Sequence, residues 1–179
     1  MPLPGQSATF TGNVRGYWFT APVDFDIVGL FIPTDASVLD MNIEVVRLDA
    51  PPPLFTTVTN SFTSLFRTVN DASAGFIPVS IQVTTGQIIG ILGQRGTVNS
   101  YGAGPFDTDI FGQAVTLARL GMQFELAPAP AHDVWTEVDG SISRVQMQYD
   151  VSTLVPEPAS LWLCAGALAA LALRRKLFR

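Results

Sequence analysis

Cysteine and histidine are almost absent from this sequence. Among its 179 residues, Cys164 is the single cysteine and His132 the single histidine. A disulfide within the chain is therefore excluded, and so is thiol chemistry anywhere before residue 164. A zinc site would need carboxylates for its remaining ligands, which is an unusual ligand set. Few residue types are left with which the chain could perform acid–base or metal chemistry.

Charged residues are scarce and unevenly distributed. They make up 14% of the chain, compared with about 25% in typical soluble domains. Four of the ten basic residues lie after residue 173, whereas all 15 acidic residues lie at or before Glu157. Residues 1–158 therefore carry a net charge of about −9. Such an acidic region repels a phosphate backbone, so the composition argues against nucleic-acid binding.

Short apolar segments separated by glycine and proline fill the first 150 residues. In the stretch 41–49, Met41, Ile43 and Val45 alternate with the other positions, which predicts a strand with one buried face. Other segments of this kind lie at residues 16–22, 25–33, 62–69, 76–83, 87–92, 115–126 and 142–149. About eight strands and no helix before the C-terminal tail predict an all-β fold. The pattern favours an antiparallel β-sandwich or jelly roll, with a barrel as the alternative.

Turn residues predict how two of these strands connect. Thr84-Thr85-Gly86 lies between segments 76–83 and 87–92, and its length and glycine predict a tight hairpin. We call residues 1–150 the body. Near its end, Val145, Met147 and Tyr149 alternate with polar residues, which predicts a last strand with one buried face.

The C-terminal stretch contains the one long apolar run. From Ala159 to Leu173 there are 15 consecutive residues without a charge. As a helix they would be about 22 Å long, shorter than the hydrocarbon core of about 30 Å, although arginine side chains can reach to the membrane surface. A buried core helix is the alternative, but apolar residues occupy every face and leave no polar stripe. The large apolar residues of the run are Leu161, Trp162, Leu163, Leu168, Leu171 and Leu173, and its basic flank is Arg174, Arg175, Lys176 and Arg179. The sequence therefore predicts a transmembrane helix with a cytoplasmic C-terminus.

This order of parts resembles the PEP-CTERM protein-sorting signal of Gram-negative bacteria. Pro156-Glu157-Pro158 is followed by the apolar run and then by the basic cluster. The resemblance implies recognition by an exosortase, a membrane-embedded protease that processes the tail near the motif. It implies an exported protein that is anchored in the inner membrane before processing and then reaches the cell surface or an extracellular polysaccharide matrix.

The first residues do not supply the export signal that such proteins normally use. The chain starts MPLPGQSATF, without a basic segment followed by about 7–15 apolar residues. Either translation starts further upstream, or a leader has already been removed. The third alternative is insertion by the tail alone, which would leave the body in the cytoplasm and give the sorting motif no use.

Three regions follow from these patterns. Residues 1–150 are predicted to form a β-sandwich ectodomain, 151–158 a linker with the Pro-Glu-Pro motif, and 159–179 the membrane helix and basic tail. The stretches GYWFTAPVDFDIVGLFIP and GFIPVSIQVTTGQIIGILGQRG also resemble, more loosely, β-sandwich ectodomains that accompany PEP-CTERM tails. That resemblance implies a secreted sandwich and no particular chemistry.

Metal and catalytic candidates in the body are few. His132 is followed by Asp133, but no G-x-S-x-G nucleophile turn is present, so His132 is expected in a polar loop. Asp107 and Asp109 lie two residues apart in GAGPFDTDIFG, which suggests a structural calcium site in a glycine-rich loop. Asp24 and Asp26 repeat the spacing. An ordinary polar loop, or a solvent-facing strand for Asp24 and Asp26, is the alternative.

Aromatic residues suggest a glycan-binding surface. Tyr17 and Trp18 are adjacent on a predicted strand and so point to opposite faces, where core packing explains them. Tyr101 and Trp135 are expected in loops, where their rings could stack on sugars.

The sequence thus predicts a non-enzymatic, exported structural or adhesive protein, with no cofactor unless calcium is bound. Its expected partners are an exosortase, the inner membrane and an extracellular polysaccharide. The alternative is a secreted, carboxylate-dependent glycan hydrolase. That enzyme would need two carboxylates about 5–10 Å apart across a concave pocket.

Overall fold

Every ladder between named strands is antiparallel in residues 1–151, the part of the chain that the computed structural model describes. These residues form thirteen strands and no helix. The all-β antiparallel prediction is therefore confirmed. Within the same residues, no helix is long and apolar enough to cross a membrane.

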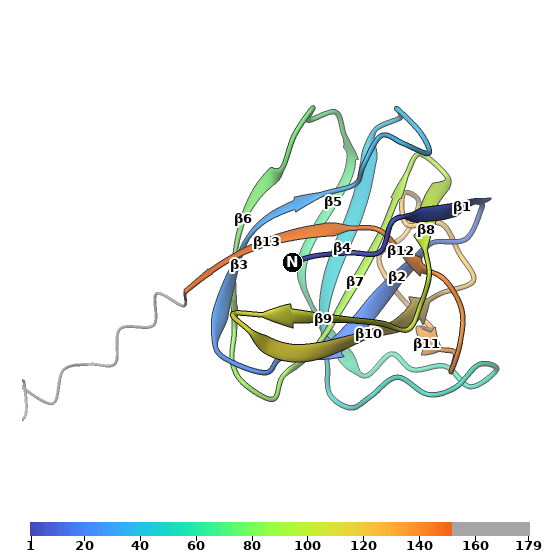
Figure 1. The fold of residues 1–179 in the computed structure, drawn as a ribbon. Helices are drawn as coiled ribbons and strands as arrows, with labels where there is room; N and C mark the ends of the chain where they lie inside the picture. Colours follow the sequence, from blue (N-terminus) through green and yellow to red (C-terminus); the bar gives the residue numbers. More distant parts are fainter. Residues whose placement is uncertain (152–179) are drawn as a thin grey trace, which may run out of the picture.

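The strands form one large curled sheet and one small sheet (Figure 1). The large sheet runs in the order β1-β8-β7-β2-β10-β11, with β12 on β8, β4 between β7 and β5, and β9 on β10. Its strands are β1 (Gln6–Thr11), β2 (Arg15–Thr20), β4 (Met41–Leu48), β5 (Phe62–Asp71), β7 (Ile88–Arg95), β8 (Val98–Gly102), β9 (Phe106–Ile110), β10 (Gln113–Gly121), β11 (Trp135–Thr136) and β12 (Ile142–Ser143). The small sheet, in the order β13-β3-β6, contains β3 (Phe25–Phe31), β6 (Ile77–Val83) and β13 (Gln146–Val151).

The main hydrophobic core lies between the two sheets. Tyr17 and Phe19 enter it from β2, and Ile27 and Leu30 enter it from β3. Met147 of β13 is buried in the same core, as the alternation near the end of the body predicts. Burial of this apolar surface is the main force that holds the small sheet on the large one.

A second core covers the opposite face of the large sheet. Val46 and Leu48 of β4 pack there against Met122, Leu126 and other residues of the connection between β10 and β11. Both faces of β4 are therefore buried, and the prediction of a single buried face is wrong for this strand. Asn42 and Glu44 are buried as well, and Glu44 accepts a hydrogen bond from the Ala131 N–H of the connection, whereas Arg47 is exposed.

The predicted hairpin at Thr84–Gly86 is also wrong. A tight turn is present, in which Gly86 adopts φ +85° and the Gln87 N–H donates to the Thr84 carbonyl. However, β6 pairs with β3 in the small sheet, whereas β7 pairs with β2 and β4 in the large sheet. The turn therefore carries the chain from one sheet to the other. Alternation identifies the buried face of a strand, but it does not identify the neighbouring strand.

Several strands are absent from the sequence-based prediction of about eight. They are β1, β8, β9 and β11, which are short, and β1 and β9 are also largely polar and exposed. The single predicted strand at 142–149 contains β12 and the first residues of β13. The stretch GAGPFDTDIFG, expected to be a loop, contains β9 and the turn into β10. β1 and β9 carry a weak apolar signal because much of their surface faces water, whereas β8 and β11 are mostly buried but too short to show a clear alternation.

The last strand, β13, ends at Val151, the last residue that the structure describes (Figure 1). This point is one residue beyond the predicted end of the body at residue 150. The predicted linker after Val151 and the predicted membrane helix lie outside the described residues.

Candidate functional site

The two residues predicted to stack on sugars lie in strands, not in loops. Tyr101 belongs to β8 and Trp135 to β11. Tyr101 is 8% exposed and Trp135 is 1% exposed. Neither ring presents an open face to a flat ligand in this arrangement. The large sheet instead brings both rings together with two arginines.

We call Phe10, Arg15, Tyr101, Arg119 and Trp135 the arginine–aromatic cluster. The guanidinium carbon of Arg15 lies 4.8 Å from the ring centroid of Trp135 and 5.3 Å from that of Phe10. That of Arg119 lies 5.5 Å from Tyr101 and 5.9 Å from Trp135. At these distances the ring faces attract the cations, and the attraction is stronger where water is excluded.

Strand register explains why these residues meet. Arg15 lies opposite Gly121 in the β2–β10 ladder, and Trp135 lies opposite the same glycine in the β10–β11 ladder. A Cβ atom at Gly121 would come within 2.8 Å of Arg15 Cδ and 2.9 Å of the Trp135 ring. The glycine therefore leaves the space in which the guanidinium group and the indole ring pack against each other.

Burial shapes the electrostatics of the cluster. Arg15 is only 6% exposed, and this loss of hydration lowers the pKa of its guanidinium group. Its Nη1 donates to the carbonyls of Val14 and Met122, at 2.9 and 2.7 Å. Arg119 forms an ion pair with Glu137, with 3.0 Å between Nε and Oε2. Burial also raises the pKa of Tyr101.

Four buried polar atoms in the cluster have no well-aligned hydrogen bond among residues 1–151. They are Arg15 Nε, the Tyr101 hydroxyl, Trp135 Nε1 and Arg119 Nε, of which Arg119 Nε lies in the ion pair with Glu137. The hydroxyl lies near Arg119, but without a well-aligned hydrogen bond. Buried polar groups are usually paired with hydrogen-bond partners. The cluster is therefore a polar region in the interior of the body and differs from the apolar core.

The sequence prediction missed Arg15, Arg119 and Glu137. A signal for the two arginines exists in the strand alternation. Arg15 shares a strand face with Tyr17 and Phe19, and Arg119 shares one with Leu117. A charged residue in register with buried apolar residues indicates a buried cation, because it lies on the same face of the strand.

His132 lies in the connection between β10 and β11, as expected. Its Nδ1 is 2.9 Å from the Pro130 carbonyl, and its ring centroid is 4.4 Å from that of Phe124. The neighbouring Asp133 exchanges two hydrogen bonds of 2.7 Å with the Asn60 side chain. Both side chains therefore fix the connection in place.

The predicted calcium ligands Asp107 and Asp109 lie on the exposed strand β9, not in a loop. Asp107 accepts a hydrogen bond from the Thr116 hydroxyl at 2.6 Å, and Asp109 accepts one from the Gly112 N–H at 3.0 Å. No group of three or more His, Cys, Asp or Glu side chains that could hold a metal occurs in the described residues. Calcium at Asp107 and Asp109 stays a prediction.

Asp24 and Asp26 do not share one exposed strand face. Asp24 precedes β3 and accepts hydrogen bonds of 2.7 Å from the N–H and the hydroxyl of Thr85. Asp26 is 6% exposed within β3. The expectation of a solvent-facing strand is therefore wrong for this pair.

The remaining predicted site residues lie outside the described residues. They are the sorting motif at Pro156, Glu157 and Pro158, the apolar run, and the basic flank that ends at Arg179.

Comparison with known protein families addresses this part of the chain directly. A family model described as the PEP-CTERM protein-sorting motif matches residues 154–176. No curated protein and no solved structure matches the chain.

The family match confirms the sorting motif and concerns the tail alone. It implies an exported protein that an exosortase sorts at the membrane. The β-rich body at residues 1–151 is consistent with an ectodomain in front of such a tail.

Proposed function

We propose that this chain is a non-enzymatic surface or matrix protein, held in the inner membrane by residues 159–179 until an exosortase processes it at Pro156-Glu157-Pro158. The observation that carries this proposal is the sorting motif matched at residues 154–176. It begins three residues after β13 ends at Val151. The body and the processing signal are thus close neighbours in the chain.

The short connection supports processing at the surface of the body. From Val151 to Pro156, an extended chain spans about 17 Å. An enzyme that acts at Pro156-Glu157-Pro158 would therefore work next to the end of the body from which β13 emerges. We infer that the two sheets form a β-sandwich, which keeps this end rigid during processing.

Structural contacts of the carboxylates support a non-enzymatic role. Glu44 is 0% exposed. Its carboxylate accepts hydrogen bonds from the Ser64 hydroxyl at 2.7 Å and from the Ala131 N–H at 2.8 Å. Asp35 forms an ion pair with Arg144 and accepts a hydrogen bond from the Ser100 hydroxyl. These groups connect segments that are far apart in the sequence, which explains their presence without a reaction. No specific observation favours the hydrolase alternative.

We also propose that the protein contacts a polysaccharide through Phe55, which packs on the buried side chain of Trp135. Phe55 is 45% exposed and packs on Trp135 with 4.9 Å between ring centroids. Leu54 and Val58 are also exposed, at 55% and 42%. We call Leu54, Phe55 and Val58 the Phe55 patch. In this proposal a sugar stacks on Phe55, while the buried Trp135 keeps the Phe55 ring in position.

Alanine substitution of the motif tests the sorting proposal. In a variant with Pro156→Ala, Glu157→Ala and Pro158→Ala, we expect the full-length chain to accumulate in the membrane fraction and to disappear from the extracellular fraction. An immunoblot of both fractions with an antibody against the body measures this. The matched control is Ser152→Ala with Thr153→Ala, just before the matched span, which should be processed normally. Normal processing of the triple variant would contradict the proposal.

A further inference from the structure

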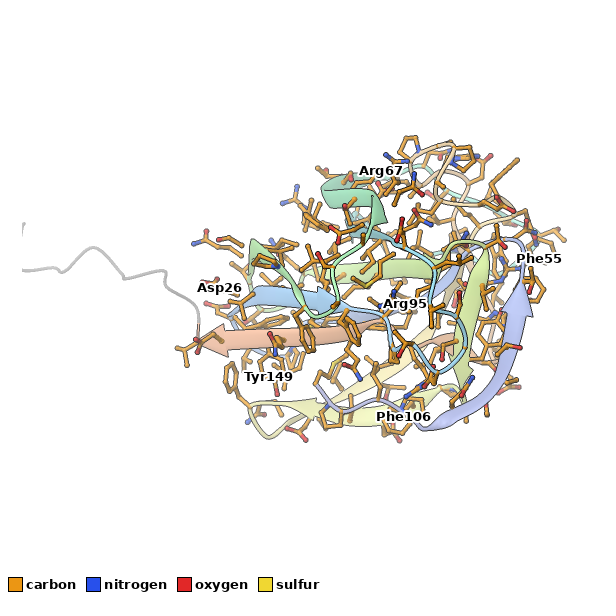
Figure 2. All side chains as sticks on the ribbon, turned by 90° about the horizontal axis from the view of Figure 1, so that it is seen from above. Asp26, Phe55, Arg67, Arg95, Phe106 and Tyr149 are labelled. Carbon is orange, nitrogen blue, oxygen red and sulfur yellow. The ribbon has the colours of Figure 1, made fainter. Side chains whose placement is uncertain are left out.

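An exposed apolar patch lies where the chain leaves the body. Phe111, in the turn between β9 and β10, is 46% exposed, and Val151, the last residue of β13, is 67% exposed. Tyr149, two residues before Val151 in β13, contacts Phe111 edge to face, with 4.9 Å between ring centroids. Figure 2 shows Tyr149 near the end of β13, the last described strand. We call Phe111, Tyr149 and Val151 the exit patch.

The backbone at Phe111 does not explain why a phenylalanine is present. Phe111 and Gly112 connect the paired residues Ile110 and Gln113, with φ values of +51° and +76°. A two-residue turn with two positive φ values favours asparagine, aspartate and glycine. A residue with a bulky side chain costs about 1–2 kcal/mol in this conformation. The ring is half exposed and contacts Tyr149 edge to face.

The tail limits how far the exit patch can be from a membrane. From Val151 to Ala159, where the apolar run starts, an extended chain spans about 27 Å. If residues 159–173 lie in the bilayer, the end of the body that carries the exit patch lies within about 27 Å of the membrane surface. Aromatic side chains are favoured at the boundary between lipid and water, because one part of this boundary is apolar and the other is hydrated.

The charges around the patch indicate which lipid surface fits. Asp109 and Asp150 flank Phe111 and Tyr149 in the sequence, and both are exposed. Asp24 is also exposed at this end, immediately before Phe25, which pairs with Val151 across the β3–β13 ladder. These carboxylates repel an anionic surface and tolerate a zwitterionic one.

We propose that the exit patch contacts the headgroup region of a zwitterionic bilayer while the tail is inserted, with Phe111 as the inserting side chain. This contact rests on the proposed membrane anchoring by residues 159–179. It holds the body in one orientation relative to the membrane, so that the Pro-Glu-Pro segment is presented to its protease from a fixed side.

A fluorophore that reports apolar surroundings tests this contact in the full-length chain. The chain carries Cys164→Ala, so that a single cysteine at position 111, 151 or 124 can be labelled with nitrobenzoxadiazole. Phe124 is the matched control, because it is 47% exposed. It follows the far end of the nine-residue strand β10, about 30 Å from the turn at Phe111. Each labelled protein is reconstituted into phosphatidylcholine vesicles.

We expect a blue-shifted emission at positions 111 and 151, quenching by headgroup spin labels at both, and neither effect at 124. In vesicles that contain anionic phosphatidylglycerol at low salt, the shift at 111 should decrease. No shift at 111, or equal shifts at all three positions, would overturn the exit patch as the contact. A shift that appears only in native membranes with the exosortase would assign the patch to the enzyme instead.

Flotation of the vesicles separates this inference from the proposal on which it depends. A chain that does not float with the vesicles contradicts membrane anchoring, and the contact fails with it. A chain that floats without a shift at 111 leaves the anchor intact and contradicts the contact alone. A further variant, Phe111→Asn, suits the turn and should not lower the free energy of unfolding. It should reduce the blue shift at position 151, and an unchanged shift would contradict the role of the Phe111 ring.

Discussion

Arg15 and Arg119 show how a buried cation is accommodated in this body. Both lie beside aromatic rings of the arginine–aromatic cluster, and Arg119 also pairs with the carboxylate of Glu137. Removing a charge from water is costly, and cation–π contacts and hydrogen bonds to carbonyl groups offset part of that cost. The cluster thereby forms a rigid support behind Trp135, against which Phe55 packs.

The contact between Phe55 and Trp135 leads to a prediction at the residue scale. Phe55→Ala should weaken binding to the extracellular polysaccharide about fivefold to tenfold, because one stacking contact is lost. Binding of the full-length chain in detergent micelles to immobilised polysaccharide from the native host measures this. Phe111→Ala removes an equally exposed ring from the opposite end of the body and should bind as the parent chain does. Equal affinities for all three proteins would contradict a glycan role for the Phe55 patch.

Some of these residues were predictable from the sequence and others were not. Tyr17 and Trp18 were expected to point to opposite faces, and they lie in the main core and against the second core, respectively. Tyr101 was expected in a loop, because the short strand β8 carries two polar residues and a glycine. The meeting of Tyr101 with Arg15 and Arg119 depends on pairing between distant strands, which alternation within one strand does not show.

At the scale of elements, the connection between β10 and β11 packs on the face of the large sheet opposite the main core. Arg67 of β5 donates to the carbonyls of Leu126 and Ala127, at 2.9 and 3.3 Å. Glu44 of β4 accepts a hydrogen bond from the Ala131 N–H and lies 3.5 Å from Arg67 Nε. These polar contacts fix a segment that has no strand pairing of its own over most of its length. They explain why a glutamate is buried in β4.

The close approach of β2 and β7 gives a prediction about stability. A Cβ atom at Gly16 would collide with the carbonyl of Ile91 and lie 2.8 Å from the Cα of Leu92. Gly16→Ala should therefore lower the free energy of unfolding by about 3 kcal/mol, because backbone atoms of a central ladder must move. Urea unfolding of the full-length chain in detergent micelles, followed by tryptophan fluorescence, measures the change.

The matched control for this variant is Gly5→Ala. No atom lies within 4 Å of a Cβ built at Gly5, so its free energy of unfolding should change by less than about 0.5 kcal/mol. If the two variants had the same stability, the tight spacing of β2 and β7 would be contradicted.

The elements also show the limits of sequence patterns. The alternation in β4 and β13 correctly indicates which residues enter the main core. The turn at Thr84–Gly86 has the length and the glycine of a hairpin turn, yet its two strands belong to different sheets. A turn fixes the local direction of the chain, whereas tertiary packing selects the sheet to which each strand belongs.

At the scale of the whole molecule, the two exposed aromatic surfaces lie at different ends of the body. Figure 2 shows Tyr149 near the end of β13 and Phe55 at the opposite end of the body. With the tail in the membrane, the exit patch would face the lipid and the Phe55 patch would face outward. One orientation therefore serves both proposed contacts.

The all-β class and the sorting tail were predictable from periodicity and from the order of motif, apolar run and basic flank. The position of these two surfaces was not predictable, because it depends on how the sheets pack.

The most direct test of the central claim is the mass of the mature protein from its native host, grown with and without the exosortase. The account predicts a C-terminus near Pro156-Glu157-Pro158 when the enzyme is present and a chain that extends to Arg179 when it is absent. A chain that still ends at Arg179 in both strains would contradict processing by the exosortase and would leave the tail as a permanent anchor.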